Sequence, residues 1–179
     1  MLVVVSDSHR ETGTGLDGRT LEAVGEADVV AHAGDLVTAD ALDAFQDVAS
    51  RLYAVHGNAD RPAVRERLPP ARSFAYEGVS VAMTHRQAGG AMGLALFGRE
   101  RDADVVVSGH THRPQVTRAE TLTLLNPGSH ADPRGNRRGH AELEPVADGL
   151  DGRLVSPDGT VAETFHVPAA ADAGDVDDS

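Results

Sequence analysis

Residues 2–9 read LVVVSDSH, an apolar run that passes directly into turn-forming polar residues. Four apolar residues in succession are typical of a strand buried on both faces, and the polar residues after them end it. The pattern recurs in DVVAHA (28–33), RLYAVH (51–56), VSVAMT (79–84) and DVVVS (104–108). These runs pass into Gly34-Asp35, Gly57-Asn58, His85 and Gly109-His110, respectively. The sequence therefore predicts five buried strands whose carboxyl ends carry polar groups.

Helical spacing between these runs indicates the fold class. It is found over residues 19–26, over 39–49 and over 90–101. In the second stretch Leu42, Phe45, Val48 and Ala49 share one face and Thr38 can cap the helix; in the third, Met92, Leu96 and Phe97 recur at helical spacing. Strands that alternate with helices predict α/β layers, in which functional groups collect outside the carboxyl ends of the strands.

The chain after Arg113 loses its helical spacing. Alternating runs at 115–118, 122–125, 140–145, 152–155 and 161–167 predict antiparallel strands joined by Gly, Asp and Pro turns. No second core is visible, so residues 1–167 are expected to form a single domain. Residues 168–179, PAAADAGDVDDS, are small, acidic and turn-forming, and they predict a disordered tail.

Composition narrows the classes of function. The 179 residues include 28 Asp and Glu against 16 basic residues, all of them Arg, and the formal net charge is -12. A chain this acidic is a poor match for a nucleic acid polymer or an anionic membrane. It contains no Cys, which excludes disulfides, thiolate metal sites and thiol nucleophiles. Acid-rich, Lys-free composition resembles that of cytoplasmic proteins from salt-accumulating archaea; the alternative is a GC-rich genome that encodes Arg in place of Lys.

The N-terminal run is too short for a signal sequence or a membrane span, so we expect a cytoplasmic protein.

The ends of the five strands bring together a pool of possible metal ligands without thiols: Asp7, His9, Asp35, Asn58, His85, His110 and His112. Carboxylate, imidazole and amide groups suit Mn²⁺, Fe²⁺, Co²⁺, Ni²⁺ or Zn²⁺. Each motif alone is as well explained by a turn, and the order and placement of all of them favour a metal site.

Taken in order, DSH (7–9), GD (34–35), GNAD (57–60), TH (84–85) and GHTH (109–112) resemble the motifs of the calcineurin-like metallophosphoesterases. Within that superfamily, the short chain and NPGS (126–129) followed by DPR (132–134) are similar to the YfcE-like phosphodiesterases. The resemblance covers about residues 1–166. It implies a four-layer α/β/β/α sandwich of two mixed sheets flanked by helices, with a dinuclear metal site at one edge.

The resemblance also implies roles for the ligands. Asp7, His9 and His112 would hold one metal, Asn58, His85 and His110 would hold the other, and Asp35 would bridge them. Two divalent cations are expected, Mn²⁺ first, with Ni²⁺, Zn²⁺, Fe²⁺ or Co²⁺ as alternatives. The implied reaction is hydrolysis of a small phosphodiester by in-line attack of a metal-bridging hydroxide.

Two other functions stay open at this stage. One is a phosphomonoesterase or nucleotide phosphatase, and the other is a metal-free protein-interaction scaffold, a role that a YfcE-like fold can also serve. A scaffold has no need of seven ligand side chains, and this chain keeps all of them. The partners expected are a small phosphate ester and, as in many family members, a second copy of the chain.

Five positions near the motifs have roles that the motifs themselves do not assign. Ala59 stands where many superfamily members carry a general-acid His, which leaves protonation of the leaving group unassigned. Arg86 and Gln87 replace the Gly-His of the YfcE-like pattern, and Arg86 either contacts a substrate phosphate or points to solvent. Asp60 is expected to orient a ligating imidazole, and Ser129 to position phosphate or the His110 loop. His32 and His56 lie within strand patterns and are predicted to be structural.

The charge generates a prediction about stability. At about 1 M salt the Debye length is about 3 Å, so repulsion between surface carboxylates is screened. We expect the midpoint of thermal unfolding to rise between about 0.1 M and about 1 M KCl, a range over which the Debye length falls from about 10 Å. A parallel series in sucrose controls for solvent exclusion. A midpoint that falls with KCl would contradict the salt-adapted interpretation.

Overall fold

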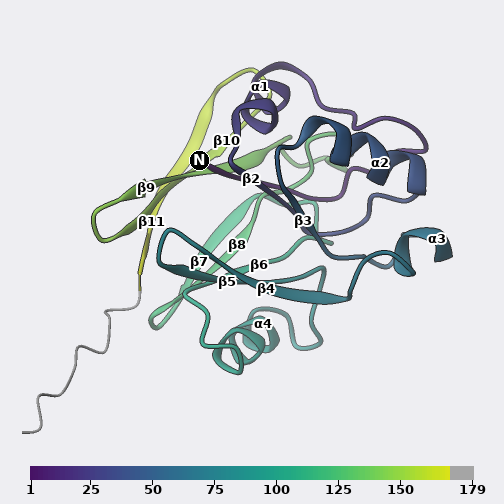
Figure 1. Ribbon diagram of the computed structural model, residues 1–179. Helices are drawn as coiled ribbons and strands as arrows, with labels where there is room; N and C mark the ends of the chain where they lie inside the picture. The colour runs from purple at the N-terminus through teal and green to yellow at the C-terminus, as the bar shows by residue number, and fades with distance from the viewer. Residues whose placement is uncertain (170–179) are drawn as a thin grey trace, which may run out of the picture.

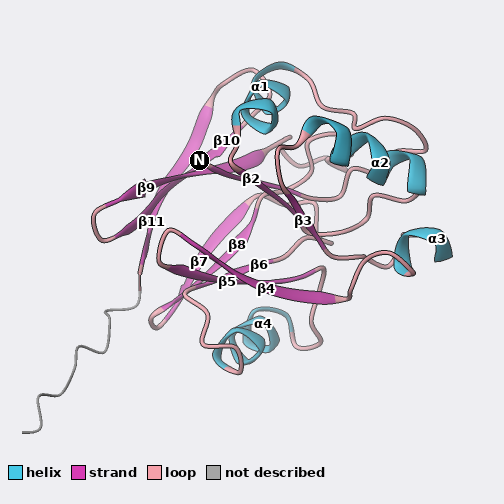
Figure 2. Ribbon diagram, viewed as in Figure 1, coloured by secondary structure: helices cyan, strands magenta, loops and turns pink. Residues whose placement is uncertain are grey.

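Two mixed β-sheets pack face to face, and helices cover both outer surfaces (Figures 1 and 2). The computed structural model describes residues 1–169. The layers are α1 to α3 on the first sheet, the two sheets themselves, and α4 on the second sheet (Figure 2). The predicted four-layer α/β/β/α sandwich is confirmed.

The elements have the following bounds. The first sheet has the order β11-β10-β9-β1-β2-β3, with β1 (Leu2–Val5), β2 (Val29–His32), β3 (Leu52–Ala54), β9 (His140–Val146), β10 (Gly149–Val155) and β11 (Val161–Pro168). The second has the order β4-β5-β6-β8-β7, with β4 (Ala71–Tyr76), β5 (Val79–Thr84), β6 (Val105–Val107), β7 (Gln115–Ala119) and β8 (Leu122–Asn126). The helices are α1 (Gly18–Glu26), α2 (Ala39–Val48), α3 (Pro62–Arg65) and α4 (Gly90–Arg99).

Strand β1 shows why the runs are apolar throughout. Leu2 and Val4 face the second sheet, while Val3 and Val5 pack against α1 and α2 on the other side. In β6, Val105 and Val107 join the core between the sheets and Val106 packs against α4. Successive side chains point to opposite faces, and both faces are covered, so every position of these central strands must be apolar.

The parallel pairings align the carboxyl ends of the predicted strands. β1 pairs in parallel with β2, and β2 with β3; in the second sheet β5 pairs in parallel with β6. The expected antiparallel strands are present, with one correction: β8 is antiparallel to β7 but parallel to β6. The first two residues assigned to the expected tail are ordered, since Pro168 ends β11 and the Ala169 N–H donates to Asp148 O at 3.0 Å. The remainder of that expected tail, residues 170–179, lies outside the described part of the chain.

Helix α4 buries only one of the three apolar residues that recur at helical spacing, Phe97. Met92 and Leu96 are 75% and 53% exposed, while Ala95, Phe97 and Gly98 are buried. Gly98 selects this face because a Cβ there would lie 2.5 Å from Val106 Cγ2, so only glycine lets the helix come this close to the sheet. In α2, Thr38 caps the helix as predicted, and Val48 is exposed although it was placed on the apolar face.

Two elements were not predicted. Helix α3 is a single turn, and β4 is a half-exposed edge strand whose apolar signal is weak. Glu77-Gly78, both at positive φ, form the two-residue turn between β4 and β5 and carried a usable hairpin signal.

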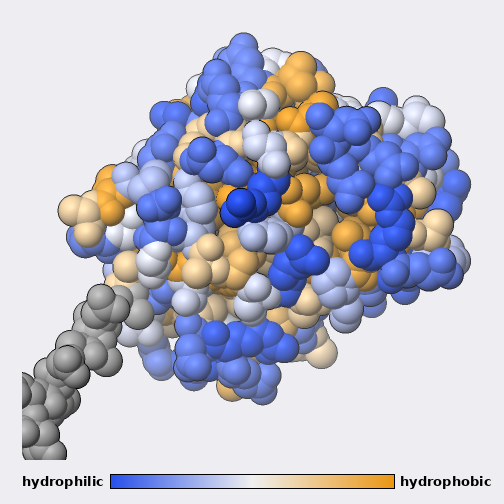
Figure 3. Space-filling model, in the orientation of Figure 1, coloured by the Kyte–Doolittle hydropathy of each residue, from blue (hydrophilic) through white to orange (hydrophobic). Residues whose placement is uncertain are grey.

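No helix within residues 1–169 is long and apolar enough to cross a membrane. Hydrophilic residues predominate on the face of the molecule that Figure 3 shows.

Helix α1 is tied to the outer strands by a buried carboxylate on β9. Glu142 is 1% exposed and accepts hydrogen bonds from Arg19 Nε at 2.8 Å, Arg153 Nη2 at 2.6 Å and His140 Nε2 at 2.9 Å. Burial acts to raise the pKa of Glu142, but these partners outweigh it and hold the pKa below its ordinary value of 4.5. The carboxylate therefore stays charged and fully partnered.

Replacing Glu142 by Gln removes this charge and leaves two guanidinium groups facing a neutral amide. We expect Glu142→Gln to lower the free energy of unfolding by about 3 kcal/mol at pH 7. Because the pKa of Glu142 is lower in the folded protein than in the unfolded chain, its charge stabilises the fold above about pH 4.5. This stabilisation is lost as the pH falls toward the folded pKa, so the difference in unfolding free energy between wild type and Glu142→Gln should narrow by about pH 3. Denaturant unfolding at both pH values measures it. Glu22→Gln, at a 65% exposed side chain 3.7 Å from the same Arg19, is the control and should cost at most about 0.5 kcal/mol.

Candidate metal centre

The candidate ligands lie where the parallel strands of both sheets end. Asp7 and His9 follow β1, Asp35 follows β2 and Asn58 follows β3, all from the first sheet. His85 follows β5, and His110 and His112 follow β6, from the second sheet. The site is therefore built across the two sheets, with each sheet contributing about half of the side chains.

Five of the seven candidates have a left-handed backbone. Their φ values are 54° at Asp7, 45° at His9, 60° at Asp35, 71° at His110 and 57° at His112. Non-glycine residues adopt this region rarely and at a cost of about 1–3 kcal/mol each, and such strain is concentrated at functional sites. Inter-strand bonds hold the strained loops in place, with Asp7 N–H donating to Gly34 O and His9 N–H to Asp35 O, both at 3.0 Å.

Two groups of ligand atoms converge within 4.8 Å among the described residues. The first is Asp7, His9 and His112, and the second is Asp7, Asp35 and His85. Asp7 Oδ1 lies 3.3 Å from His112 Nε2, and Asp35 Oδ2 lies 3.2 Å from His85 Nε2. Asp35 Oδ2 is also 3.4 Å from His9 Nε2, so this carboxylate stands between the two sets of imidazoles.

Two of the imidazoles have Nε2 facing these carboxylates, at His85 and His112. His85 Nδ1 donates to Ala33 O at 2.8 Å, and His112 Nδ1 donates to Asp132 O. With the proton on Nδ1, the lone pair of Nε2 points into the site, as in a metal-ligating histidine. Within residues 1–169, buried His85 Nε2 has no hydrogen-bond partner. Lone pairs and carboxylate oxygens that face each other fit a bound cation.

Asn58 and His110 border this centre. The His110 ring lies 5.3 Å from the His85 ring, edge to face. Asn58 is exposed, and together with His85 it lines a cavity next to the centre. The backbone N–H of His110 donates to Asp7 Oδ2 at 3.0 Å. Their donor atoms are not part of the two convergent groups.

Asp60 has a different role from the expected one. Its carboxylate orients no imidazole; it accepts backbone N–H groups from Asp35 at 3.1 Å, Val37 at 2.6 Å and Gly57 at 2.7 Å. It therefore joins the loops that follow β2 and β3. A buried carboxylate can satisfy several backbone donors at once, and no local pattern in the sequence indicates which donors are unpaired.

Ser129 is fully buried and holds the Asp7 loop. Its hydroxyl donates to Asp7 O at 2.7 Å and accepts from Asp132 N–H at 2.7 Å. The buried hydroxyl therefore positions the Asp7 loop, and not phosphate or the His110 loop as expected. Arg86 is exposed beside the centre. His32 is structural, as predicted: its ring is buried, with Nε2 2.7 Å from Ser8 Oγ and Nδ1 accepting from Gly34 N–H at 3.2 Å.

Glycines set the spacing of the ligands, a feature that the sequence interpretation understated. A Cβ at Gly57 would overlap Asp35 Oδ1, and a Cβ at Gly109 would overlap Ser6 Oγ and lie 2.6 Å from Asp7 Oδ2. Neither residue has positive φ, so close approach, not turn geometry, requires glycine there. The signal in the sequence was each glycine directly before a candidate ligand.

Proton affinities follow from this packing. Burial acts to raise the pKa of Asp35, yet the contact with His85 and the N–H of Ala59 outweigh it and bring the pKa to about 2. Burial acts to lower the pKa of His85, but Asp35 outweighs it and raises the pKa. Burial also opposes ionisation of Asp7, whose pKa His9 nevertheless helps to lower. Two ionised carboxylates thus attract positive charge, and a cation that binds Nε2 of His85 competes with a proton for that nitrogen.

Known proteins share sequence and fold with this chain. A profile of the calcineurin-like phosphoesterase superfamily domain matches residues 1–146. A protein of Methanothermobacter thermautotrophicus named "probable metallophosphoesterase" is 30% identical over 170 residues, covering 93% of this chain and 98% of that protein.

Two solved structures share the fold. A predicted phosphoesterase from Streptococcus pneumoniae has a TM-score of 0.71 and 22% identity over 92% of this chain and 96% of its own. Vps29 from Entamoeba histolytica, complexed with Zn²⁺, has a TM-score of 0.75 and 20% identity over 93% of this chain and 98% of its own. At these identities the likeness concerns the fold alone.

Adding one methyl group at Gly109 tests the close packing of the centre. We expect Gly109→Ala to weaken binding of Mn²⁺ at least about tenfold, since the new Cβ displaces the carboxylate of Asp7. Calorimetric titration with Mn²⁺ measures this. Gly25→Ala, in α1 with no atom within 4 Å of the new Cβ, is the control and should bind as wild type. Equal affinity in all three proteins would contradict the assigned site.

Proposed function

The chain belongs to the calcineurin-like phosphoesterase superfamily, and from this membership we propose that it is a metal-dependent phosphodiesterase acting on a small phosphodiester. The observation that carries the proposal is the convergence of two carboxylates with His9, His85 and His112 at one sheet edge. Phosphoryl transfer needs little covalent chemistry from the protein and depends on positioning and charge stabilisation.

The donor set fits two divalent cations. We assign Asp7, His9 and His112 to one, with His85, His110 and Asn58 for the other, and Asp35 between them because its Oδ2 is within 3.4 Å of imidazole nitrogens on both sides. Nitrogen and oxygen donors without thiolate suit Mn²⁺, Fe²⁺, Co²⁺, Ni²⁺ or Zn²⁺, and we take Mn²⁺ first in this proposal. When bound, such a pair supplies a nucleophile from water at neutral pH and neutralises charge on the phosphoryl oxygens.

The protein's own groups position the reactants. Asp60 and the Ala59 N–H hold Asp35 in place, the latter through a 2.7 Å bond to Oδ1. The side chain of Ala59 has no proton to give to a departing alkoxide. Substrates whose leaving groups need no protonation are therefore favoured.

The backbone argues against a metal-free scaffold of the same fold. Left-handed conformations at five candidate ligands cost several kcal/mol together, and a surface used only for protein contact gains nothing from them. A phosphomonoesterase is distinguished by experiment, through the ratio of rates on bis-p-nitrophenyl phosphate and p-nitrophenyl phosphate.

Removing one charge from Asp35 tests the proposal. We expect wild type to hydrolyse bis-p-nitrophenyl phosphate in the presence of Mn²⁺ and Asp35→Asn to lose more than about 100-fold in kcat/KM, since the carboxylate between the imidazoles becomes neutral. Metal content, measured on the same preparations, should fall in parallel.

Asp43→Asn makes the same chemical change at an exposed ion pair with Arg67 and should leave both quantities at the wild-type level. Wild type that neither retains metal nor hydrolyses either ester, in low or molar salt, would exclude the enzyme. Faster hydrolysis of the monoester would replace the diesterase with a phosphomonoesterase.

A further inference from the structure

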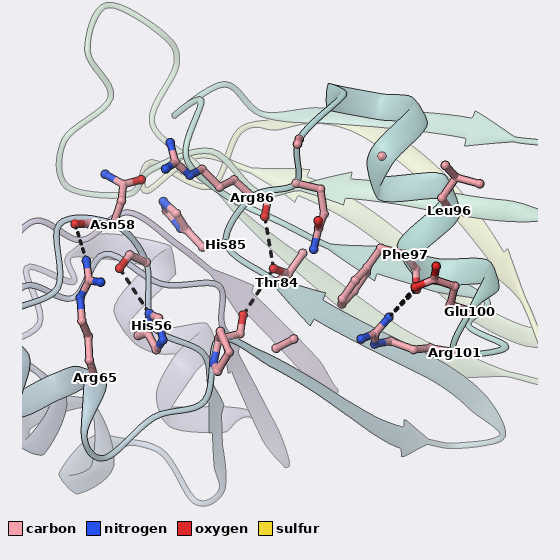
Figure 4. A pocket seen from close by; sticks show the side chains of 16 residues that line it. His56, Asn58, Arg65, Thr84, His85, Arg86, Leu96, Phe97, Glu100 and Arg101 are labelled. Carbon is pink, nitrogen blue, oxygen red and sulfur yellow. Dashed lines mark hydrogen bonds and ion pairs between the residues drawn. The ribbon is translucent and has the colours of Figure 1, made fainter.

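A cavity of about 730 Å³ opens beside the candidate metal centre. Figure 4 shows Asn58, His85 and Arg86 toward one end and Leu96, Phe97 and Arg101 toward the other. Neither His9 nor His112 is among its lining residues, so the cavity adjoins only the His85 side of the centre. Its volume lies in the usual range of small-molecule sites and is sufficient for a nucleoside-sized group.

The walls of this cavity are basic, in contrast to the chain as a whole. Arg65, Arg86 and Arg101 line it together with a single acid, Glu100, whereas the net charge of the chain is -12. Glu100 pairs with Arg101 at 3.5 Å, so the net positive charge of the walls comes from Arg65 and Arg86. A concave site with a net charge concentrates substrates of the opposite sign. The cavity therefore suits an anionic group.

Two of the three arginines have structural partners. Arg65 donates to Asp60 O at 2.7 Å and Asn58 O at 2.8 Å, which holds the loop after β3. Arg101 lies 3.9 Å above the Phe97 ring and donates to Phe97 O at 3.1 Å. Their guanidinium groups serve the walls of the cavity.

Arg86 is the third. It is exposed, and its side chain makes no hydrogen bond or ion pair with residues 1–169. Its backbone follows His85 directly, and that segment is held by Gly109 N–H donating to His85 O at 3.0 Å. A fixed backbone and an uncommitted planar guanidinium suit bidentate binding of phosphate.

We propose that this cavity receives one of the two ester groups of the substrate and that Arg86 selects a group carrying an additional phosphate. The inference rests on the proposed phosphodiesterase function. Leu96, whose side chain is 53% exposed, contacts the uncharged part of the group, while the guanidinium of Arg86 donates to the additional phosphate near the centre. Nucleoside bisphosphate esters are the class of substrate that this arrangement fits.

Two ligands that differ by one phosphate provide the test. Calorimetric titration of the Mn²⁺-loaded protein with thymidine 3′,5′-bisphosphate and thymidine 5′-monophosphate measures the preference for the additional phosphate. We expect wild type to bind the bisphosphate about tenfold more tightly, and Arg86→Gln to lose most of that preference. Arg86→Lys keeps the charge and should retain part of it.

Arg51→Gln is the matched control, because Arg51 is exposed, precedes β3 at the strand end opposite the centre, and does not line this cavity. It should keep the wild-type ratio. Equal affinity of wild type for both ligands, or an unchanged affinity ratio in Arg86→Gln, overturns the inference about Arg86. If wild type still hydrolyses bis-p-nitrophenyl phosphate in the presence of Mn²⁺, the proposed phosphodiesterase function stands. Absence of that hydrolysis overturns both.

Discussion

Two buried carboxylates, Asp7 and Asp35, lie at the edge where both sheets end, and the local structure is arranged around their charge. Each is at most 2% exposed, and burying an ionised carboxylate without partners is strongly unfavourable. Asp7 receives the Ser6 hydroxyl and the His110 N–H, and Asp35 receives the Ala59 N–H. The remaining oxygens face imidazole nitrogens. Local structure that holds two buried negative charges this close together favours the binding of a cation between them.

The double sheet makes this arrangement rigid. β1 and β6 are covered on both faces by apolar side chains, so the loops that follow them begin from backbone positions fixed by the core. Gly57 and Gly109 then allow backbone and carboxylate to approach closely, and Asp60 and Ser129 tie neighbouring loops together through main-chain groups. Strain at the ligand residues is sustained because each strained loop is bonded on more than one side.

The strands and the candidate ligands could be predicted because both produce local patterns: LVVV is apolar throughout, and each ligand directly follows such a run. Roles that depend on the neighbouring loop could not. Asp60 was expected to face an imidazole, but its partners are three backbone N–H groups distributed over two loops. Of the three apolar residues noted in α4 only Phe97 is buried, because GAMGLALFGR is apolar on most sides and the close approach permitted by Gly98 turns the face with Ala95 and Phe97 toward the sheet. Edge strand β4 was missed because half-exposed strands carry little apolar signal.

Charge at long range and charge in contact act in opposite directions in this protein. A net charge of -12 repels an anionic ester at low ionic strength, whereas the arginines around the cavity attract it. At about 1 M salt the Debye length is about 3 Å, and the long-range repulsion is then screened away. A guanidinium that donates directly to phosphate acts at hydrogen-bond distance, where screening is weakest. Selectivity that comes from Arg86 would therefore survive in salt that removes the field of the rest of the surface, which is why a single uncommitted arginine beside His85 can matter in so acidic a chain.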